Sequence, residues 1–543
     1  MVSRVRQTPI VDHHLALAQL LARLSADQRA AATAPPGPVL CIAPAGSGKT
    51  TTLVARIAWL IDDGTGPATI AAITFNRRAA AELAERLDDA LAPLGLAPDT
   101  VRVRTFHALG LEILRDAGRS PIAIVDRAGL LGRLFPDLED AARNELDTAI
   151  SRLKVDLRAS AAEVDADPDA GPIARRFVTY EQALEDRGAL DFDDLILGAL
   201  RALESDPELL ARWRLRCGHL LVDEIQDLDR SQLELGLVLA GADRRIFLVG
   251  DDDQSIYGWR LADVRRIFGL AARLPGLEQH TLVTNYRCPR PVVERSVRLI
   301  GVNGERFEKS VRAGPDGAGR LVLAPDADAD HERIGRVLDS WPADDASRAV
   351  IARTNLELVP AATAAVERGI AFSAAGVDLP LEAPGLDAAL AALEFAEERE
   401  PGVPLLVQIG LARAGTDVRL ATACDLLVGW APRYSSAAAL RSAVEASGRK
   451  LAELRTESAQ LTLATAHGAK GLEFDHVLVL MDADRFPSRR ALDDAHEPER
   501  ALEEERRLAY VAWTRARRSL TLLYDPAAPS RFLLDAFSPS ELG

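Results

Sequence analysis

The sequence contains few cysteines and few lysines. Its 543 residues include four cysteines, widely scattered, with neither disulfide-framework nor zinc-site spacing, which fits a reducing cytosol. Arginine supplies most of the basic charge, because lysine occurs only at Lys49, Lys154, Lys309, Lys450 and Lys470. A lysine inside a motif is therefore more informative here than in an average sequence.

Long apolar runs are absent as well. No run approaches the ~20 residues of a membrane span, and the first residues show no signal-peptide core or cleavage site. We therefore expect a cytoplasmic protein with no membrane contact. The net charge of −16 argues against a protein that binds nucleic acid over its whole surface, but it permits a local basic groove.

Strand-like and helix-like segments alternate along the chain. Apolar strands are expected at 38–43, 68–75, 101–106, 219–223 and 244–250, with helical patterns between the first three. This alternation predicts a parallel sheet covered by helices. A second sheet of the same kind is expected from about residue 280, at the segments "TLVTNY", "RAVIART", "LTLATA", "HVLVLMD" and "SLTLLY".

These patterns predict an α/β fold of two parallel-sheet domains, each interrupted by a mainly helical insertion. The first domain is expected at 1–110 and 190–276, with its insertion at 111–189. The second is expected at 277–374 and 459–543, with a reduced insertion at 375–458.

The stretch "APAGSGKTT" (43–51) lies between a predicted strand and a predicted helix. Its glycines allow backbone N–H groups to surround a phosphate. Lys49 would reach the β- and γ-phosphates of ATP, and Thr50 would hold Mg²⁺. The strict pattern begins with glycine, where this chain has Ala43. The predicted nucleotide contacts of the loop are Ala45, Gly46, Ser47, Gly48, Lys49, Thr50 and Thr51.

A second acidic motif, "LLVDEIQD" (220–227), follows a later strand. Asp223 at the strand end would hold Mg²⁺ through water, and Glu224 would polarise the attacking water as general base. A solvated acidic turn is the alternative for such a string alone.

The stretch "GDDDQSIYGWR" (250–260) combines three carboxylates with exposed-looking aromatic residues. Aromatic side chains stack on nucleic-acid bases without regard to sequence. We expect the carboxylates to face the nucleotide, where Mg²⁺ offsets them. Tyr257 and Trp259 are candidates for such stacking, with ordinary core aromatics as the alternative.

Taken in order, the motifs resemble the superfamily 1 DNA helicases of the UvrD, Rep and PcrA group over nearly the whole chain. The matching segments are "LSADQRAAA", "TFNRRAAAELAERL", "TFHALGLEIL", "LDFDDLI", "VDEIQD", "VGDDDQSIYGWR", "VTNYRCPRPVV", "TAHGAKGLEFDHV" and "EEERRLAYVAWTRA". The resemblance implies two RecA-like motor domains that use ATP and Mg²⁺. It also implies 3′→5′ movement on single-stranded DNA and unwinding of tailed duplex, in DNA repair or replication restart.

Residue roles follow from the same resemblance. Gln254 would sense the γ-phosphate, and Arg287 and Arg515 would stabilise transition-state charge as arginine fingers. The implied catalytic set is Lys49, Asp223, Glu224, Gln254, Arg287 and Arg515. The adenine and ribose contacts would be Gln28, Tyr286 and Glu473.

The implied DNA contacts are Phe75, Arg78, Phe106, His107, Tyr257, Trp259, Arg260 and His467. For His107 a hydrogen-bonded turn histidine stays an alternative. His467 and Lys470 either face the DNA backbone or brace their own loop.

The chain departs from the family pattern in its second half. The second insertion is short and lacks the aromatic-rich acidic segment of relatives, which puts duplex contact in doubt. The chain ends about 25 residues after "TRARR", so we expect no nuclease domain, zinc module or partner-binding tail. Two alternatives therefore stay open: a translocase that works with a separate nuclease, repair or defence partner and unwinds poorly alone, or an ATP-gated DNA-binding subunit.

Overall fold

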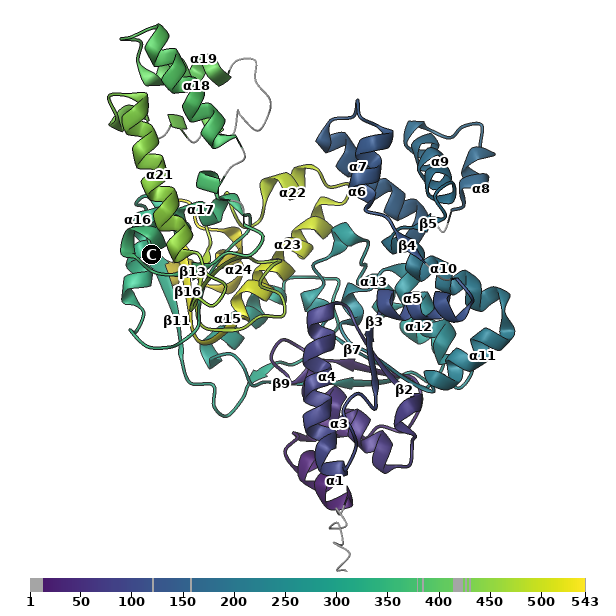
Figure 1. The fold of residues 1–543 in the computed structure, drawn as a ribbon. Helices are drawn as coiled ribbons and strands as arrows, with labels where there is room; N and C mark the ends of the chain where they lie inside the picture. The colour runs from purple at the N-terminus through teal and green to yellow at the C-terminus, as the bar shows by residue number, and fades with distance from the viewer. Residues whose placement is uncertain are drawn as a thin grey trace, which may run out of the picture. The chain divides into compact units, whose positions relative to one another are not determined.

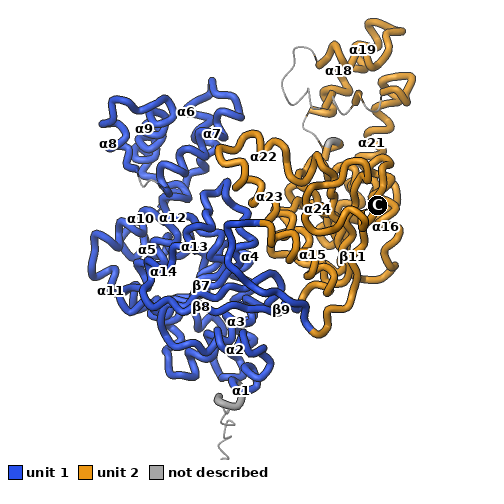
Figure 2. The backbone as a smooth tube through the Cα atoms, turned by 180° about the vertical axis from the view of Figure 1, so that it is seen from behind, with its two compact units in different colours: residues 1–286, 303–314 blue, residues 287–302, 315–543 orange. Residues whose placement is uncertain are grey.

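The computed structural model describes residues 13–119, 122–156, 159–377, 379–382, 385–413, 423–424, 427–428 and 431–542. The chain divides into two compact units (Figure 2). Unit 1 comprises residues 1–286 and 303–314, and unit 2 comprises residues 287–302 and 315–543. Each unit contains a six-stranded parallel sheet, which confirms the predicted α/β fold.

Six strands of unit 1 form one fully parallel sheet. Their order is β3 (Arg102–Thr105), β2 (Ile70–Thr74), β6 (His219–Val222), β7 (Ile246–Gly250), β1 (Val39–Ile42) and β8 (Glu278–Thr281). Alternate residues of a strand point to opposite faces. Leu40 and Ile42 enter one hydrophobic cluster, while Val39 and Cys41 enter another. The sheet is thus buried on both faces, which explains the nearly continuous apolar strands.

Helices cover both faces of this sheet (Figure 1). One face packs against α1 (His13–Ala22), α2 (Ala26–Ala32), α3 (Lys49–Asp62) and α4 (Arg77–Leu91). The other packs against α5 (Phe106–Asp116), α10 (Phe192–Ser205), α11 (Pro207–Arg216), α12 (Arg230–Ala240), α13 (Arg265–Phe268) and α14 (Leu270–Arg273).

The insertion of unit 1 is a small helical subdomain with its own hydrophobic core. It contains β4 (Ala123–Ile124), α6 (Arg127–Leu134), α7 (Asp140–Ser151), a π-helical turn η3 (Arg152–Asp156), α8 (Ala161–Asp165), α9 (Pro172–Glu185) and β5 (Ala189–Leu190). At its base the buried Lys154 ammonium lies 3.0 Å from Asp191 and 2.7 Å from Asp194. The "LDFDDLI" segment therefore joins the insertion to α10 through a buried ion network.

The sheet of unit 2 is also fully parallel. Its order is β11 (Arg320–Pro325), β16 (Ala516–Tyr524), β15 (Phe474–Leu480), β12 (Arg348–Ala352), β14 (Leu461–Thr465) and β13 (Phe372–Ser373). The helices of this part are α15 (Arg290–Ile300), α16 (Asp330–Ser340), α17 (Val359–Arg368), α22 (Arg489–Asp493), α23 (Pro498–Trp513), α24 (Arg531–Ala536) and α25 (Pro539–Leu542). The insertion contributes α18 (Leu386–Arg399), α19 (Leu405–Arg413) and α21 (Ala437–Leu454), which share a separate core.

One expected strand lies in the other sheet system. The segment "TLVTNY" was predicted for the second sheet, and that prediction is wrong, because β8 pairs with β1 and β9 (Thr284–Asn285) pairs with β10 (Arg312–Ala313) in unit 1. The polar edge strand β8 carries no apolar signal to reveal it. The first segment of unit 1 accordingly ends at residue 286 and not at the expected 276. Residues 303–314 also belong to unit 1, whereas residues 287–302 between the two segments belong to unit 2.

None of the helices that the structure describes is both long enough and apolar enough to cross a membrane.

Candidate nucleotide and nucleic-acid site

The loop between β1 and α3 has the backbone of a phosphate cradle. Gly46 and Gly48 have φ angles of 67° and 83°, a left-handed conformation that favours glycine. A Cβ at Gly48 would lie 2.5 Å from Nε2 of Gln28, and this amide donates to the Ser47 carbonyl at 2.8 Å. The N–H of Tyr286 donates to the Gly46 carbonyl at 2.8 Å. The structure thus places both predicted adenine residues beside the loop.

Lys49 and the acidic pair meet beside this loop. The Lys49 ammonium donates to Oε2 of Glu224 at 3.1 Å. Burial lowers the pKa of Lys49, but the carboxylates of Glu224, Asp223 and Asp251 outweigh it and raise the pKa overall. Burial and the neighbouring Glu224 raise the pKa of Asp223 to about 7. Lys49 thus faces the two carboxylates of Asp223 and Glu224, while the third, Asp251, also contacts Lys309.

The residues at this position fit a magnesium ion accompanied by phosphates. The buried hydroxyl of Ser47 has no hydrogen-bond partner within the described part of the chain. Thr50 and Asp223 offer oxygen donors, which Mg²⁺ prefers. The described residues contain no group of three or more His, Cys, Asp and Glu side chains suited to a metal. A cation here would thus depend on phosphate and water oxygens for the rest of its shell, as Mg²⁺ usually does in nucleotide sites.

Two cations of the protein itself contact the acidic stretch Asp251–Asp253. The Lys309 side chain has no exposed surface, and its ammonium lies 2.8 Å from Asp251 and 2.9 Å from Asp253, with Asp252 also in contact. Arg306 adds two contacts to Asp253, at 3.0 and 2.8 Å. These two cations offset much of the charge on the stretch, and the offset by Mg²⁺ stays a prediction. We call Arg306, Lys309 and Asp251–Asp253 the acidic clamp.

Gln254 follows the acidic clamp directly. Its amide donates to Oδ2 of Asp251 at 2.8 Å, and its backbone N–H donates to the Asp251 carbonyl at 2.9 Å. The side chain is 4% exposed and belongs to the short helix η5 (Asp252–Gln254). The clamp therefore fixes the position of the predicted γ-phosphate sensor.

Four predicted DNA residues form one aromatic platform: Phe75, Tyr257, Trp259 and Arg260. The rings of Phe75 and Tyr257 stack at 5.3 Å, and Tyr257 meets Trp259 edge-on at 6.2 Å. The Arg260 guanidinium lies 5.1 Å from the Trp259 ring and 6.0 Å from the Phe75 ring. Trp259 is 62% exposed, so it is not a core residue. An exposed indole next to a guanidinium is suited to base stacking beside a phosphate.

The remaining DNA predictions of unit 1 divide into exposed and buried residues. Arg78 is exposed at the start of α4, and His107 is half-buried on α5. Phe106 is 2% exposed and belongs to the core on one face of the sheet, so it is no longer a candidate for base contact. Its apolar side chain faces the sheet, whereas the next helical position turns outward.

Sequence reasoning missed Phe192. This ring is 54% exposed and packs edge-on against His107 at 5.8 Å. Burial lowers the pKa of His107, the carboxylate of Asp193 opposes that shift, and Arg260 adds to it. No signal in "LDFDDLI" marks this exposure, because Phe192 precedes Leu195 and Ile196 at the spacing of an apolar helix face.

The predicted arginines of unit 2 gather around one carboxylate. The Arg287 Nε donates to Glu473 at 2.7 Å, and an Arg287 Nη donates to the Thr514 carbonyl at 3.3 Å. Arg515 is 1% exposed and donates to the Thr514 hydroxyl at 3.1 Å and to the Leu472 carbonyl at 3.2 Å. Unit 2 thus brings Arg287, Glu473 and Arg515 together, with the Glu473 carboxylate already paired.

His467 lies in the loop between β14 and β15 and is half-buried.

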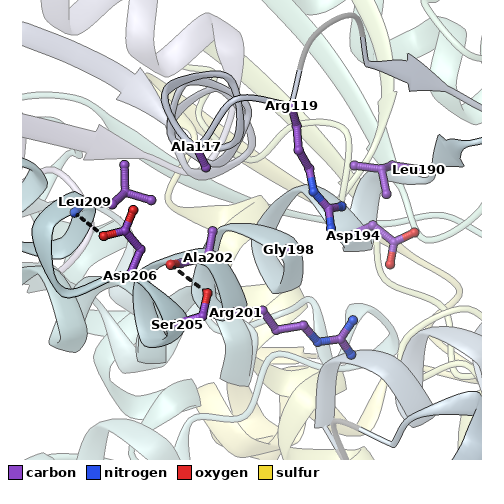
Figure 3. A pocket seen from close by; sticks show the side chains of 10 residues that line it. All are labelled: Ala117, Arg119, Leu190, Asp194, Gly198, Arg201, Ala202, Ser205, Asp206 and Leu209. Atoms are coloured by element: carbon purple, nitrogen blue, oxygen red, sulfur yellow. Dashed lines mark hydrogen bonds between the residues drawn. The ribbon is translucent and has the colours of Figure 1, made fainter.

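A separate pocket of 290 Å³ contains none of the predicted residues (Figure 3). It lies along α10, between the end of α5 and the start of α11. Two of its polar groups serve helix ends: the Ser205 hydroxyl donates to the Ala202 carbonyl at 3.2 Å, and Asp206 accepts from the Leu209 N–H at 3.0 Å. The pocket is therefore distinct from the phosphate loop.

Two families of known proteins match the chain, one in each unit. The UvrD/REP helicase N-terminal domain matches residues 24–275, and the UvrD-like helicase C-terminal domain matches residues 434–526. The chain therefore belongs to the UvrD/Rep helicase family. It is 31% identical over 578 residues to the ATP-dependent DNA helicase UvrD2 of Mycobacterium tuberculosis, covering 95% of this chain and 81% of the relative. It is 33% identical over 311 residues to the ATP-dependent DNA helicase PcrA of Staphylococcus aureus, covering 54% of this chain and 42% of that relative.

Proposed function

We propose that the protein is an ATP-dependent DNA helicase that moves 3′→5′ along single-stranded DNA and unwinds duplex, in DNA repair or replication restart. The observation that carries the proposal lies within unit 1. An exposed aromatic platform follows Gln254 by a few residues, and Gln254 contacts Asp251 close to the Lys49–Glu224 pair. Since five residues span at most ~18 Å, a change at the platform can reach the phosphate site through a short, buried segment.

In this proposal each catalytic side chain has a separate task. Lys49 binds the β- and γ-phosphates, and Glu224 accepts a proton from the attacking water. Arg287 and Arg515 donate to the charge that develops on the phosphoryl oxygens. Thr50 and Asp223 would hold Mg²⁺, which would neutralise phosphate charge. Gln28 and Tyr286 would contact the adenine, and Glu473 the ribose.

The platform side chains would bind the strand without selecting a sequence. Base stacking on an aromatic ring contributes ~1–3 kcal/mol for any base, which suits a motor that passes every base. Arg78 and Arg260 would contact phosphates, which positions a strand without reading it. His107 and the exposed Phe192 extend the aromatic surface, and His467 of unit 2 would contact the backbone.

Two assays test the function. ATP hydrolysis should rise when single-stranded DNA is added, and a duplex with a 3′ single-stranded tail should be unwound. A matched duplex with a 5′ tail is the control for direction. Equal unwinding of both substrates would contradict 3′→5′ movement, and hydrolysis indifferent to DNA would contradict the helicase assignment.

The second candidate is a single-stranded DNA translocase that needs a nuclease or repair partner. The helical insertion of unit 2 favours it, because several apolar side chains are exposed there, notably Phe395 at 60% and Leu411 at 65%. Exposed apolar residues in one subdomain are typical of an interaction surface. DNA-stimulated hydrolysis with no unwinding by the isolated protein would favour this candidate.

A further inference from the structure

Gln226 lies between the catalytic carboxylate and the acidic clamp. Its Nε2 donates to Oε2 of Glu224, the same oxygen that accepts from Lys49. Its Oε1 accepts from the backbone N–H of Asp251 at 3.0 Å. The side chain is 1% exposed, on the short helix η4 (Ile225–Asp227) that follows Glu224. One amide therefore contacts two strand ends of the sheet.

The direction of this amide follows from its partners. A backbone N–H only donates, so the Gln226 atom facing Asp251 is the carbonyl oxygen. The NH₂ group must then face the Glu224 carboxylate, which only accepts when ionised. Both bonds use the glutamine in the single orientation that satisfies them, and a carboxylate or a hydrocarbon side chain cannot make the pair.

The surroundings leave the amide little freedom. A Cβ at Gly250 would lie 2.2 Å from Oε1 of Gln226 and 2.7 Å from the Ile225 side chain, so the strand end must be glycine. The Ser255 hydroxyl donates to the backbone carbonyl of Gln226 at 3.2 Å. Gln226 is thus bound to the stretch between β7 and the aromatic platform at two points, Asp251 and Ser255.

We infer that Gln226 is a positioning residue that transmits DNA occupancy of the aromatic platform to Glu224. A shift of residues 251–255 moves the Asp251 N–H and the Ser255 hydroxyl, which both donate to Gln226. The Gln226 amide follows this shift, and the Glu224 carboxylate that it contacts moves with it. The acidic clamp holds Asp251 on the opposite side and keeps the stretch rigid. The inference rests on the proposed function, because it takes Glu224 as the general base and single-stranded DNA as the activator.

The principal test is Gln226→Met in the full chain. Methionine has a similar length and fills the same space, but it makes neither hydrogen bond. We expect the ratio of turnover with oligo-dT to turnover without DNA to fall by about tenfold, as for loss of a hydrogen bond to a charged group. The KM for ATP and the affinity for oligo-dT should each change by less than about twofold, because the phosphate loop and platform are intact.

Gln232→Met is the matched control. Gln232 is another buried glutamine of unit 1, at 5% exposed, and its side chain caps α12 by accepting from the Asp229 N–H. Its loss removes a buried amide without touching Glu224 or Asp251. The DNA-stimulated ratio should match that of the unaltered protein.

A double variant separates transmission from simple structural damage. In a Trp259→Ala background the platform has already lost its DNA signal, so adding Gln226→Met should lower the ratio by less than about twofold more. Two independent defects would instead multiply. If Gln226→Met folds poorly, judged by its melting temperature, the uncharged Gln226→Leu also makes neither hydrogen bond and is measured in the same way.

Three results would count against the inference. A normal ratio in Gln226→Met would overturn it. So would equal losses with and without DNA, since Gln226 would then act on Glu224 alone, and so would multiplicative losses in the double variant. Absence of DNA stimulation in the unaltered protein is a different failure, because it overturns the proposed function before any variant is made.

Discussion

Two acidic stretches end neighbouring strands of the unit 1 sheet, yet their ion pairs differ in burial. Asp223 and Glu224 follow β6, and Asp251–Asp253 follow β7, which pairs with β6. The second stretch contacts Arg306 and Lys309, and the Lys309 side chain has no exposed surface. At the first, Lys49 pairs with Glu224, while burial and Glu224 raise the pKa of Asp223 to about 7.

The difference shows how to separate structural from functional carboxylates. A buried charge is costly unless paired, so a stretch that serves the fold carries its own cations. A stretch that serves catalysis keeps a carboxylate that a ligand can reach, as the partly exposed Glu224 does. The counter-ions, and not the acidic residues themselves, therefore indicate the role.

The largest expected effect is loss of stability when the clamp loses its lysine. Lys309→Met leaves buried carboxylates short of a cation, which should cost about 3–5 kcal/mol of unfolding free energy. Lys49→Met should cost about 1 kcal/mol or less, because the Glu224 side chain is partly exposed and water can solvate it. Urea denaturation of both variants provides the measurement.

Turnover should show the reverse order for these two variants. Lys49→Met should abolish most ATP hydrolysis, whereas folded Lys309→Met should retain more of it. Equal stability losses in the two variants would remove the distinction between the stretches.

The next effect is on catalysis alone. Glu224→Gln should lower turnover at least ~100-fold, as for loss of a general base, and leave nucleotide binding intact. Asp252→Asn makes the same isosteric change within the clamp and should lower turnover far less. Single-turnover hydrolysis and nucleotide titration measure the two quantities. Near-normal turnover of Glu224→Gln would exclude Glu224 as the base.

Much of this arrangement could be predicted from the sequence, because it depends on local patterns. The phosphate loop needs only a strand, glycines and Lys49 in series, and the sheets follow from alternating apolar segments. Trp259 was expected to stack on DNA because its stretch resembles a motif of the helicase family. Its 62% exposure fits that assignment.

The acidic clamp could not be predicted, because its partners are separated in sequence. Lys309 lies in residues 303–314, which return to unit 1 after α15 of unit 2, and no local signal marks that return. Phe106 failed for a related reason: its motif matched, but the helix turned that side chain into the core. Gln226 likewise needed the strand order, which brings β6 and β7 together.

A smaller effect concerns the platform that the clamp supports. Trp259→Ala should weaken binding to single-stranded DNA by ~1–3 kcal/mol, equally on oligo-dT and mixed sequence. The melting temperature should hardly change, because the indole is largely exposed. Phe106→Ala provides the contrast: it should cost about 3–5 kcal/mol of stability and leave the affinity per folded molecule unchanged. A destabilised Trp259→Ala with normal affinity would show the indole to be structural.

The smallest expected effect is a pH dependence of the stabilisation by Mg²⁺, which we assign to Asp223. The pKa of Asp223, raised to about 7 by burial and by Glu224, means that its carboxyl is mostly protonated at pH 6 and mostly ionised at pH 8. Mg²⁺ binds the ionised form. At pH 6 about one carboxyl in ten is ionised, so the stabilisation by Mg²⁺ should be about 1 kcal/mol smaller than at pH 8.

The measurement is the melting temperature with a non-hydrolysable ATP analogue, with and without Mg²⁺, at both pH values. Asp223→Asn should remove the pH dependence of the Mg²⁺ increment, while Asp252→Asn should keep it, because Asp252 is buried against Lys309 inside the clamp. A Mg²⁺ increment that depended on Asp252 instead would place the cation at the clamp and reverse the roles of the two stretches.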